Sequence, residues 1–163
     1  MLQDLNHLPM SLLFNKMRLF SRGSGPLVSV LIASRGHCTD LLQAISSIYD
    51  LSFDKSSVEF ILKIDGDDTE TLSALPFLSS VVPIKSIVSP QGNGYADMHL
   101  WANDMASLAS GDWLLLFNDK ARLIFQNWDL GLRDCLSPYH DDLFMFVVDV
   151  VSNPKSTNFF FVR

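Results

Sequence analysis

Short apolar runs alternate along this chain with segments in which apolar residues recur every three or four positions. An apolar run of about 4–8 residues is typical of a buried strand, and the recurring pattern is typical of one helix face. The apolar runs are residues 28–33, 58–64, 84–88 and 113–117, followed by 143–151 and 158–162. Strands that alternate with helices usually pair in parallel, because each helix provides the crossover between two strands. The sequence therefore predicts an α/β fold.

Three segments between these runs carry the helical pattern. Their apolar stripes are Leu41, Ile45 and Ile48, then Met98, Trp101, Met105 and Leu108, and then Trp128, Leu132 and Cys135 or Leu136. We expect Thr39 or Asp40 to cap the first helix, because short polar side chains accept hydrogen bonds from its first N–H groups. Gly111 is expected to end the second helix. The first helix and the strands on either side of it make one βαβ unit.

Residues 1–26 differ from the rest of the chain and are predicted to be a helical extension with a linker. Pro9 suits the first turn of a helix, and Ser, Gly and Pro over residues 21–26 favour a linker. Lysine and arginine make this segment basic, which would suit a membrane surface, but we favour a helix packed on its own domain. The domain itself is predicted to span residues 27–163.

The overall charge argues against nucleic acid as a partner. The 163 residues carry a formal net charge of −6 and are 48% hydrophobic, which fits a soluble domain with a sizeable core. The two cysteines, Cys38 and Cys135, have neither disulfide-framework nor zinc spacing, and we expect a reduced, cytoplasmic protein. No apolar run is long enough to predict a transmembrane helix.

Polar residues directly follow three of the predicted strands. These strand ends are residues 34–36, 65–68 and 118–120. Ligands of open α/β sheets bind beyond the carboxyl ends of the strands, so we expect these residues to lie along one edge. The sequence thus predicts that its candidate binding residues lie close together.

The order and spacing of these segments resemble the GT-A glycosyltransferases of the family-two type, which transfer a sugar from a nucleoside diphosphate. The resemblance covers residues 27–136 and rests on residues 28–35, 59–68, 103–111 and 113–120. It implies a three-layer α/β/α, Rossmann-like domain with a mostly parallel sheet, truncated after the nucleotide-binding half. It also implies that the ligand is a nucleotide sugar.

The resemblance assigns the first two strand ends to the nucleoside. Ala33, Ser34 and Arg35 would lie against the base and ribose, and Asp65 would accept a hydrogen bond from the base. A carboxylate suits an imide N–H such as that of uracil, so a UDP-type donor is favoured. Asp65 as a turn or capping residue, and Arg35 as a solvated loop charge, remain alternatives.

The third strand end, Asn118-Asp119-Lys120, stands where the family carries the acidic motif that holds Mg²⁺ or Mn²⁺. Asp119 matches that motif and is the one expected metal ligand, whereas Lys120 departs from it. An ammonium group only donates and repels a cation, so metal binding is expected to be weakened or lost. Lys120 could instead neutralise the diphosphate, accompany a loss of transfer activity, or point into solvent.

Two further loops carry weaker signals. Residues 91–95 are glycine-rich and enter a helix, where they would either approach a diphosphate or form a plain turn. Asp67 and Asp68 are predicted to form a helix-capping turn rather than a metal site. Trp101, Trp113 and Trp128 are expected to pack in the core rather than stack on a sugar.

The resemblance places the general base of sugar transfer in the half of the fold that follows the metal motif. Asp141, Asp142 and Asp149 lie there but in no recognisable motif. We therefore expect a nucleotide-binding half without a complete acceptor site, and the acceptor stays unidentified. The apolar residues 159–162 either complete the sheet or leave an edge for a homodimer or a partner domain.

Two functions are compatible with these residues. The first is a glycosyltransferase domain, active when complete or complemented by a partner. The second is a degenerate, non-catalytic GT-A-like module that binds a nucleotide sugar or a protein. A dinucleotide-binding domain ranks lower, because no G-x-G-x-x-G turn follows the first strand.

Overall fold

The computed structural model describes residues 26–136, 145–147 and 160–162. Its strands and helices are β1 (Val28–Ser34), α2 (Cys38–Leu51), β2 (Val58–Asp65), α3 (Thr69–Val81), β3 (Ile84–Ser89), α4 (Met98–Leu108), β4 (Trp113–Leu116), α5 (Trp128–Leu136), β5 (Met145–Val147) and β6 (Phe160–Val162). Short 3₁₀ turns at Lys55–Ser57 and Gly94–Asp97 precede β2 and α4. The predicted extension, and the acids at 141, 142 and 149, lie outside the described residues.

The described strands form one six-stranded sheet in the order β3-β2-β1-β4-β6-β5. Strand β1 pairs in parallel with β2 on one side and with β4 on the other, and β2 pairs in parallel with β3. Strand β6 is antiparallel to both β4 and β5. The predicted mostly parallel α/β sheet is therefore confirmed. Strands β2 and β3 lie on one side of β1, whereas β4 lies on the other side. The strand order therefore reverses between β1 and β4, and open α/β sheets bind their ligands at such a point.

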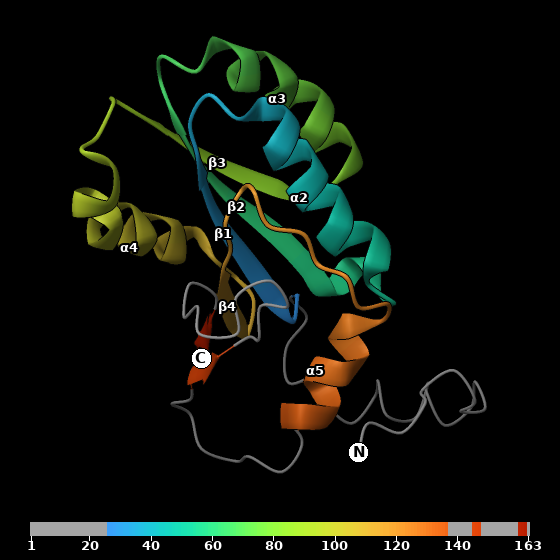
Figure 1. Ribbon diagram of the computed structural model, residues 1–163. Helices are drawn as coiled ribbons and strands as arrows, with labels where there is room; N and C mark the ends of the chain where they lie inside the picture. Colours follow the sequence, from blue (N-terminus) through green and yellow to red (C-terminus); the bar gives the residue numbers. More distant parts are fainter. Residues whose placement is uncertain (1–25, 137–144, 148–159, 163) are drawn as a thin grey trace.

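Helices cover both faces of the sheet, which gives three layers (Figure 1). Helices α2 and α3 lie on one face, where the predicted stripe of Leu41, Ile45 and Ile48 packs on the alternate side chains of β1 and β2. Helix α4 lies on the opposite face, where Met105 packs on Leu31 and Ile61 in a smaller cluster. Both faces of β1 are buried, as its continuous apolar run predicts.

Two predictions about helix ends need correction, and a third is confirmed. Helix α2 begins at Cys38 with His37 as its N-cap, because the first helical hydrogen bond runs from Leu41 N–H to the His37 carbonyl. Thr39 and Asp40 already lie inside the helix, so neither is the cap. Helix α4 ends at Leu108, before Gly111. The predicted turn at Asp67 and Asp68 is confirmed, since Asp68 accepts from the Thr71 N–H and begins α3.

The C-terminal apolar run completes the sheet. Phe160–Val162 pairs with β4 on one side and with β5 on the other, so β6 is an interior strand. Within the described ranges, no helix is long and apolar enough to cross a lipid bilayer.

A buried carboxylate ties the amino-terminal edge of the sheet together. Glu59 accepts hydrogen bonds from the Ser29 hydroxyl at 2.6 Å and from the Ser110 hydroxyl at 2.9 Å, and it pairs with Lys85 at 3.0 Å. Burial opposes ionisation of Glu59, but hydrogen bonds from Ser29 and Ser110 and the Lys85 ammonium outweigh it. The pKa of Glu59 is thus lowered from its ordinary 4.5.

The lowered pKa of Glu59 predicts a pH-dependent contribution to stability. A folded-state pKa below the unfolded value stabilises the fold above the unfolded pKa, and this is lost as the pH falls through the folded pKa. We expect Glu59→Gln to lower the free energy of unfolding by about 1–3 kcal/mol at neutral pH. Urea denaturation should show this difference shrinking in acid. The exposed Asp104→Asn change is the control, and a deficit independent of pH would contradict the assignment.

Two glycines predict opposite effects of the same substitution. A Cβ at Gly111 would lie 2.6 Å from the backbone nitrogen of Ser29, whereas a Cβ at Gly131 in α5 would meet nothing within 4 Å. We expect Gly111→Ala to destabilise the domain by about 1–3 kcal/mol through overpacking. Gly131→Ala should stabilise it by about 0.5–1 kcal/mol through helix propensity. Urea denaturation of both variants tests this, and shifts of the same sign would refute it.

Candidate functional site

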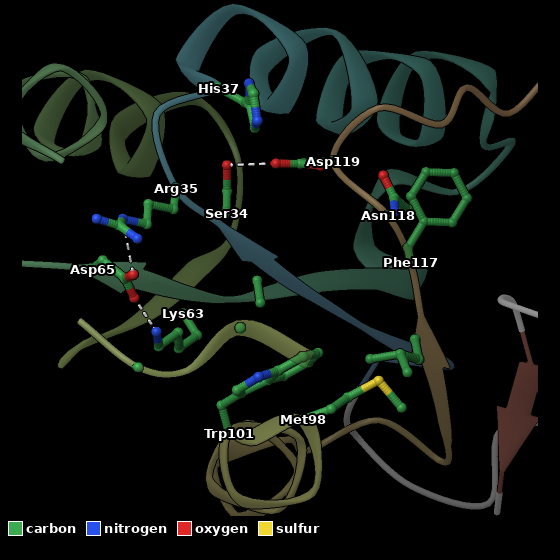
Figure 2. Close-up of a pocket in the computed structure, with 14 residues that line it drawn as sticks. Ser34, Arg35, His37, Lys63, Asp65, Met98, Trp101, Phe117, Asn118 and Asp119 are labelled. Atoms are coloured by element: carbon green, nitrogen blue, oxygen red, sulfur yellow. Dashed lines mark hydrogen bonds and ion pairs between the residues drawn. The ribbon is translucent and has the colours of Figure 1, made fainter. Parts of the chain in front are cut away.

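A pocket of about 280 Å³ opens at the carboxyl edge of the sheet, between the strand ends and α4 (Figure 2). This volume is close to the roughly 300 Å³ at which small-molecule sites begin. Its walls come from the ends of β1, β2 and β4, the loop before α4, and the first turns of α4. The lining residues are Ala33, Ser34, Arg35, His37, Lys63, Asp65, Gly92, Gly94, Met98, Trp101, Leu116, Phe117, Asn118 and Asp119.

The structure brings together nearly all of the residues predicted to bind the nucleotide sugar. Those that line the pocket are Ala33, Ser34, Arg35, Asp65, Asn118 and Asp119. Lys120 is exposed and is not among the lining residues, although its backbone N–H donates to the Asn118 side chain at 2.8 Å. Because three separate strands end here, the predicted convergence follows from the parallel pairing of β1 with β2 and β4.

Asp65 lies between two cationic side chains at one end of the pocket. Lys63 forms an ion pair with Asp65 Oδ1, and Arg35 Nε lies 3.4 Å from Asp65 Oδ2 (Figure 2). The Lys63 and Asp65 side chains are 11% and 6% exposed, whereas Arg35 is 47% exposed. Burial of both partners weakens solvent screening of the pair, so its charges fix the local arrangement more firmly than a surface pair would.

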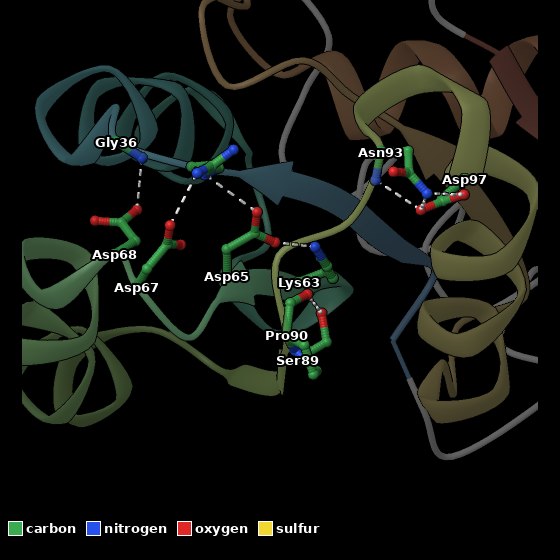
Figure 3. Close-up of polar contacts among 10 residues, drawn as sticks. Gly36, Lys63, Asp65, Asp67, Asp68, Ser89, Pro90, Asn93 and Asp97 are labelled. Atoms are coloured by element: carbon green, nitrogen blue, oxygen red, sulfur yellow. Dashed lines mark hydrogen bonds and ion pairs between the residues drawn. The ribbon is translucent and has the colours of Figure 1, made fainter.

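Acidic side chains hold the loop that follows β1 against the start of α3 (Figure 3). Asp68 accepts from the Gly36 N–H at 2.8 Å, and Asp67 accepts from Arg35 at 2.8 Å. Gly36 has a φ of +68°, a conformation that favours glycine. Burial opposes ionisation of Asp68, but hydrogen bonds from Thr71 and Gly36 outweigh it and lower its pKa. Asp67 and Asp68 therefore position Arg35.

Asp119 faces the end of β1 from the end of β4. The Ser34 hydroxyl donates to Asp119 Oδ2 at 2.8 Å, and Asp119 is 8% exposed (Figure 2). This hydrogen bond joins residues 85 positions apart in sequence. It fixes one carboxylate oxygen of Asp119 and leaves further lone pairs for a ligand.

The loop before α4 is organised by Asp97. Its carboxylate accepts from the Asn93 N–H at 2.7 Å and from the Asn93 amide (Figure 3), and these hydrogen bonds lower its pKa. The loop thereby brings Gly92 and Gly94 to the pocket. Gly94 has a φ of +62°, which lets the backbone turn into α4.

Six of the lining residues were not predicted as parts of the pocket: His37, Lys63, Met98, Trp101, Leu116 and Phe117. Lys63 lies two residues before Asp65 on the same strand face, and its signal in the sequence is a charge inside an apolar run. Trp101 packs with the α4 core cluster, as predicted, but it also lines the pocket beside Met98. Trp113 and Trp128 are buried in the main core, as expected.

Among the residues that the structure describes, no group of three or more His, Cys, Asp or Glu side chains near Asp119 could hold a metal ion. Asp119 supplies one carboxylate, one oxygen of which accepts from Ser34, and the Asn118 side-chain oxygen accepts from Lys120 N–H. Mg²⁺ is typically held by one or two carboxylates together with substrate phosphates and water. The residue after Asp119 is a lysine rather than a second acid, so a metal here would depend largely on the ligand for its oxygens.

Comparison with solved structures identifies the fold as that of the N-terminal part of GT-A glycosyltransferases. The TarS 1-349 structure from S. aureus in complex with UDP matches with a TM-score of 0.64 and 13% identity over 76% of this chain. The mannosyltransferase PcManGT from Pyrobaculum calidifontis, in complex with GDP-Man and Mn²⁺, matches with a TM-score of 0.65 and 11% identity over 94% of this chain.

The chain spans only part of these proteins. It covers 35% of the TarS 1-349 chain and 51% of the mannosyltransferase chain. A further TarS 1-349 structure, in complex with UDP-GlcNAc, matches with a TM-score of 0.60, 14% identity over 76% of this chain, and coverage of 34% of its own. The sequence matches no protein-family model and no curated protein.

Proposed function

We propose that this chain is the donor-binding part of a glycosyltransferase and that it binds a nucleoside-diphosphate sugar, with a UDP sugar favoured. The observation that supports this most directly is the shared pocket of Asp65 and Asp119, which end different strands. One carboxylate is available for the base and the other lies near the expected diphosphate. The similar structures with UDP, UDP-GlcNAc and GDP-Man lend support to a ligand of this class.

The proposed ligand would extend from β2 toward β4 across the end of β1. Its base would meet Asp65 and Arg35, and its ribose would lie against Ala33 and Ser34. The diphosphate would then reach the glycine loop before α4, where backbone N–H groups favour anions. Sugar transfer would additionally need an acceptor and a general base.

A non-catalytic binding module is the second candidate, and Lys120 is the observation that favours it. A lysine stands where the resembling family has a second metal-binding acid, and its side chain is exposed. Such a domain would retain nucleotide binding through Asp65 and lose turnover. Release of the sugar from a UDP sugar, by transfer or hydrolysis, in the presence of the purified chain would exclude this candidate.

The proposed role of Asp65 predicts a specific loss of nucleotide affinity. Isothermal titration calorimetry should detect UDP or a UDP sugar binding to the parent chain at millimolar ligand or below. Asp65→Ala should weaken this binding by about tenfold or more, because a charge-assisted hydrogen bond to the base is lost. Asp50→Ala is the matched control, since Asp50 is exposed and does not line the pocket. No binding by the parent would count against the proposed function.

Lys120 stands where the resembling family has an acid, so replacing it with an acid is predicted to make UDP binding depend on a metal. Lys120→Asp places a second carboxylate next to Asp119, and oxygen ligands are what Mn²⁺ prefers. We expect this variant to bind UDP at least about tenfold more tightly with Mn²⁺ than without it, beyond any Mn²⁺ effect in the parent. Lys120→Ala separates the new ligand from the mere loss of positive charge. An equal Mn²⁺ response in both variants would show that the position is not part of a metal motif.

A further inference from the structure

Lys63 is a buried cation that lines the pocket. It lies on the face of β2 that packs toward α4, between Ile61 and Asp65 along that face. Lysine is almost never fully buried without a partner, and here the partner is Asp65 Oδ1. An apolar residue at this position would continue the Ile61 surface at no desolvation cost. Lys63 instead lines the pocket with its ammonium beside the carboxylate.

The cations on either side of Asp65 give the pocket an ordered set of polar groups. Lys63 pairs with one carboxylate oxygen and Arg35 with the other, so Asp65 lies between them (Figure 2). Ammonium and guanidinium groups only donate hydrogen bonds, and an ionised carboxylate only accepts them. The three side chains therefore present a donor, an acceptor and a donor in succession. The carboxylate keeps lone pairs for a further donor while both cations stay in place.

We propose that Lys63 is a specificity-determining residue that, with Asp65 and Arg35, selects uracil as the base. The inference rests on the proposed function, because it assumes that the pocket holds a nucleoside diphosphate. The imide edge of uracil presents a carbonyl, an N–H and a second carbonyl. This acceptor–donor–acceptor order is the complement of the order that Lys63, Asp65 and Arg35 provide.

The other common bases mismatch this order. Guanine has an amino group in place of one carbonyl, so a donor would face one of the two cations. Cytosine and adenine present a ring-nitrogen acceptor beside an amino group, and the acceptor would face the Asp65 carboxylate. A site built to hydrogen-bond one partner rejects an analogue strongly, because its own polar groups are then left unpaired. Asp65 alone would accept an N–H from either uracil or guanine. With a cation on each side of Asp65, the site favours uracil, because only uracil has a carbonyl on both sides of the N–H.

A cation in the pocket also attracts any diphosphate, so base selection must be separated from charge. Calorimetry with UDP, GDP, CDP and ADP achieves this, because the four ligands share one diphosphate. We expect the parent chain to bind UDP at least about tenfold more tightly than ADP, with GDP and CDP also weaker than UDP. Lys63→Met should reduce the ratio of UDP to ADP affinity by about tenfold, the worth of one charge-assisted hydrogen bond.

Two further variants complete the experiment. Lys63→Gln keeps a neutral N–H donor, so its UDP-to-ADP ratio should fall between those of the parent and Lys63→Met. Lys63→Gln also replaces Lys63→Met as the test variant if circular dichroism shows that Lys63→Met does not fold. Lys55→Met removes one positive charge from an exposed site outside the pocket and should leave the ratio unchanged.

The outcomes separate the two proposals. If the parent binds ADP, CDP or GDP as tightly as UDP, or if folded Lys63 variants keep the parental UDP-to-ADP ratio, the role of Lys63 is overturned while nucleotide binding stands. If the parent binds none of the four ligands at millimolar concentration, the proposed function itself fails. A ratio that falls in Lys63→Met and in Lys55→Met alike would assign the effect to charge and would also overturn the inference.

Discussion

The parallel pairing of β1 with β2 on one side and with β4 on the other is the constraint on which the candidate site depends. It aligns Ser34 with Ile64 and Leu31 with Leu116, so the residues that follow these strands reach the same edge. Side chains far apart in sequence then meet without any long loop, as the hydrogen bond between Ser34 and Asp119 illustrates. A slip of one residue in either pairing would turn the strand-end side chains to the opposite face of the sheet.

The two edges of the sheet use buried carboxylates differently. At the amino-terminal edge, Glu59 accepts from Ser29 and Ser110 and pairs with Lys85, so it joins three strands and the turn before β4. That network is satisfied within the protein, and it holds β4 beside β1. At the carboxyl edge, Asp65 and Asp119 retain lone pairs that face a pocket. Ion pairs and a hydrogen bond hold Asp65 and Asp119 in place at the carboxyl edge, and their remaining lone pairs are available for a ligand.

The sequence predicted the inner strands well because parallel strands buried on both faces must be continuously apolar. It predicted the convergence of Asp65 and Asp119 for the same reason, since their places at strand ends follow from the strands. Helix α3 was not assigned as a helix in advance, because Pro76 stands inside it and its apolar residues form no clear stripe. Its capping turn at Asp68 was nevertheless recognisable. The pairing of Lys63 with Asp65 does not follow from the sequence, because alternating charges on a strand also fit a solvated edge.

The electrostatic difference between the two ends of the pocket bears on how a diphosphate would bind. Asp65 is flanked by Lys63 and Arg35, so the end proposed for the base has its negative charge compensated. The Asp119 carboxylate accepts from the neutral hydroxyl of Ser34, and among the described residues no cationic side chain forms an ion pair with it. A diphosphate placed near Asp119 would be repelled unless a cation lay between them. A metal taking most of its ligands from phosphate and water would fill that role, and so would Lys120 if its loop turned toward the pocket. The second route needs no metal, and it would make the lysine a replacement for the acid that the resembling family has there.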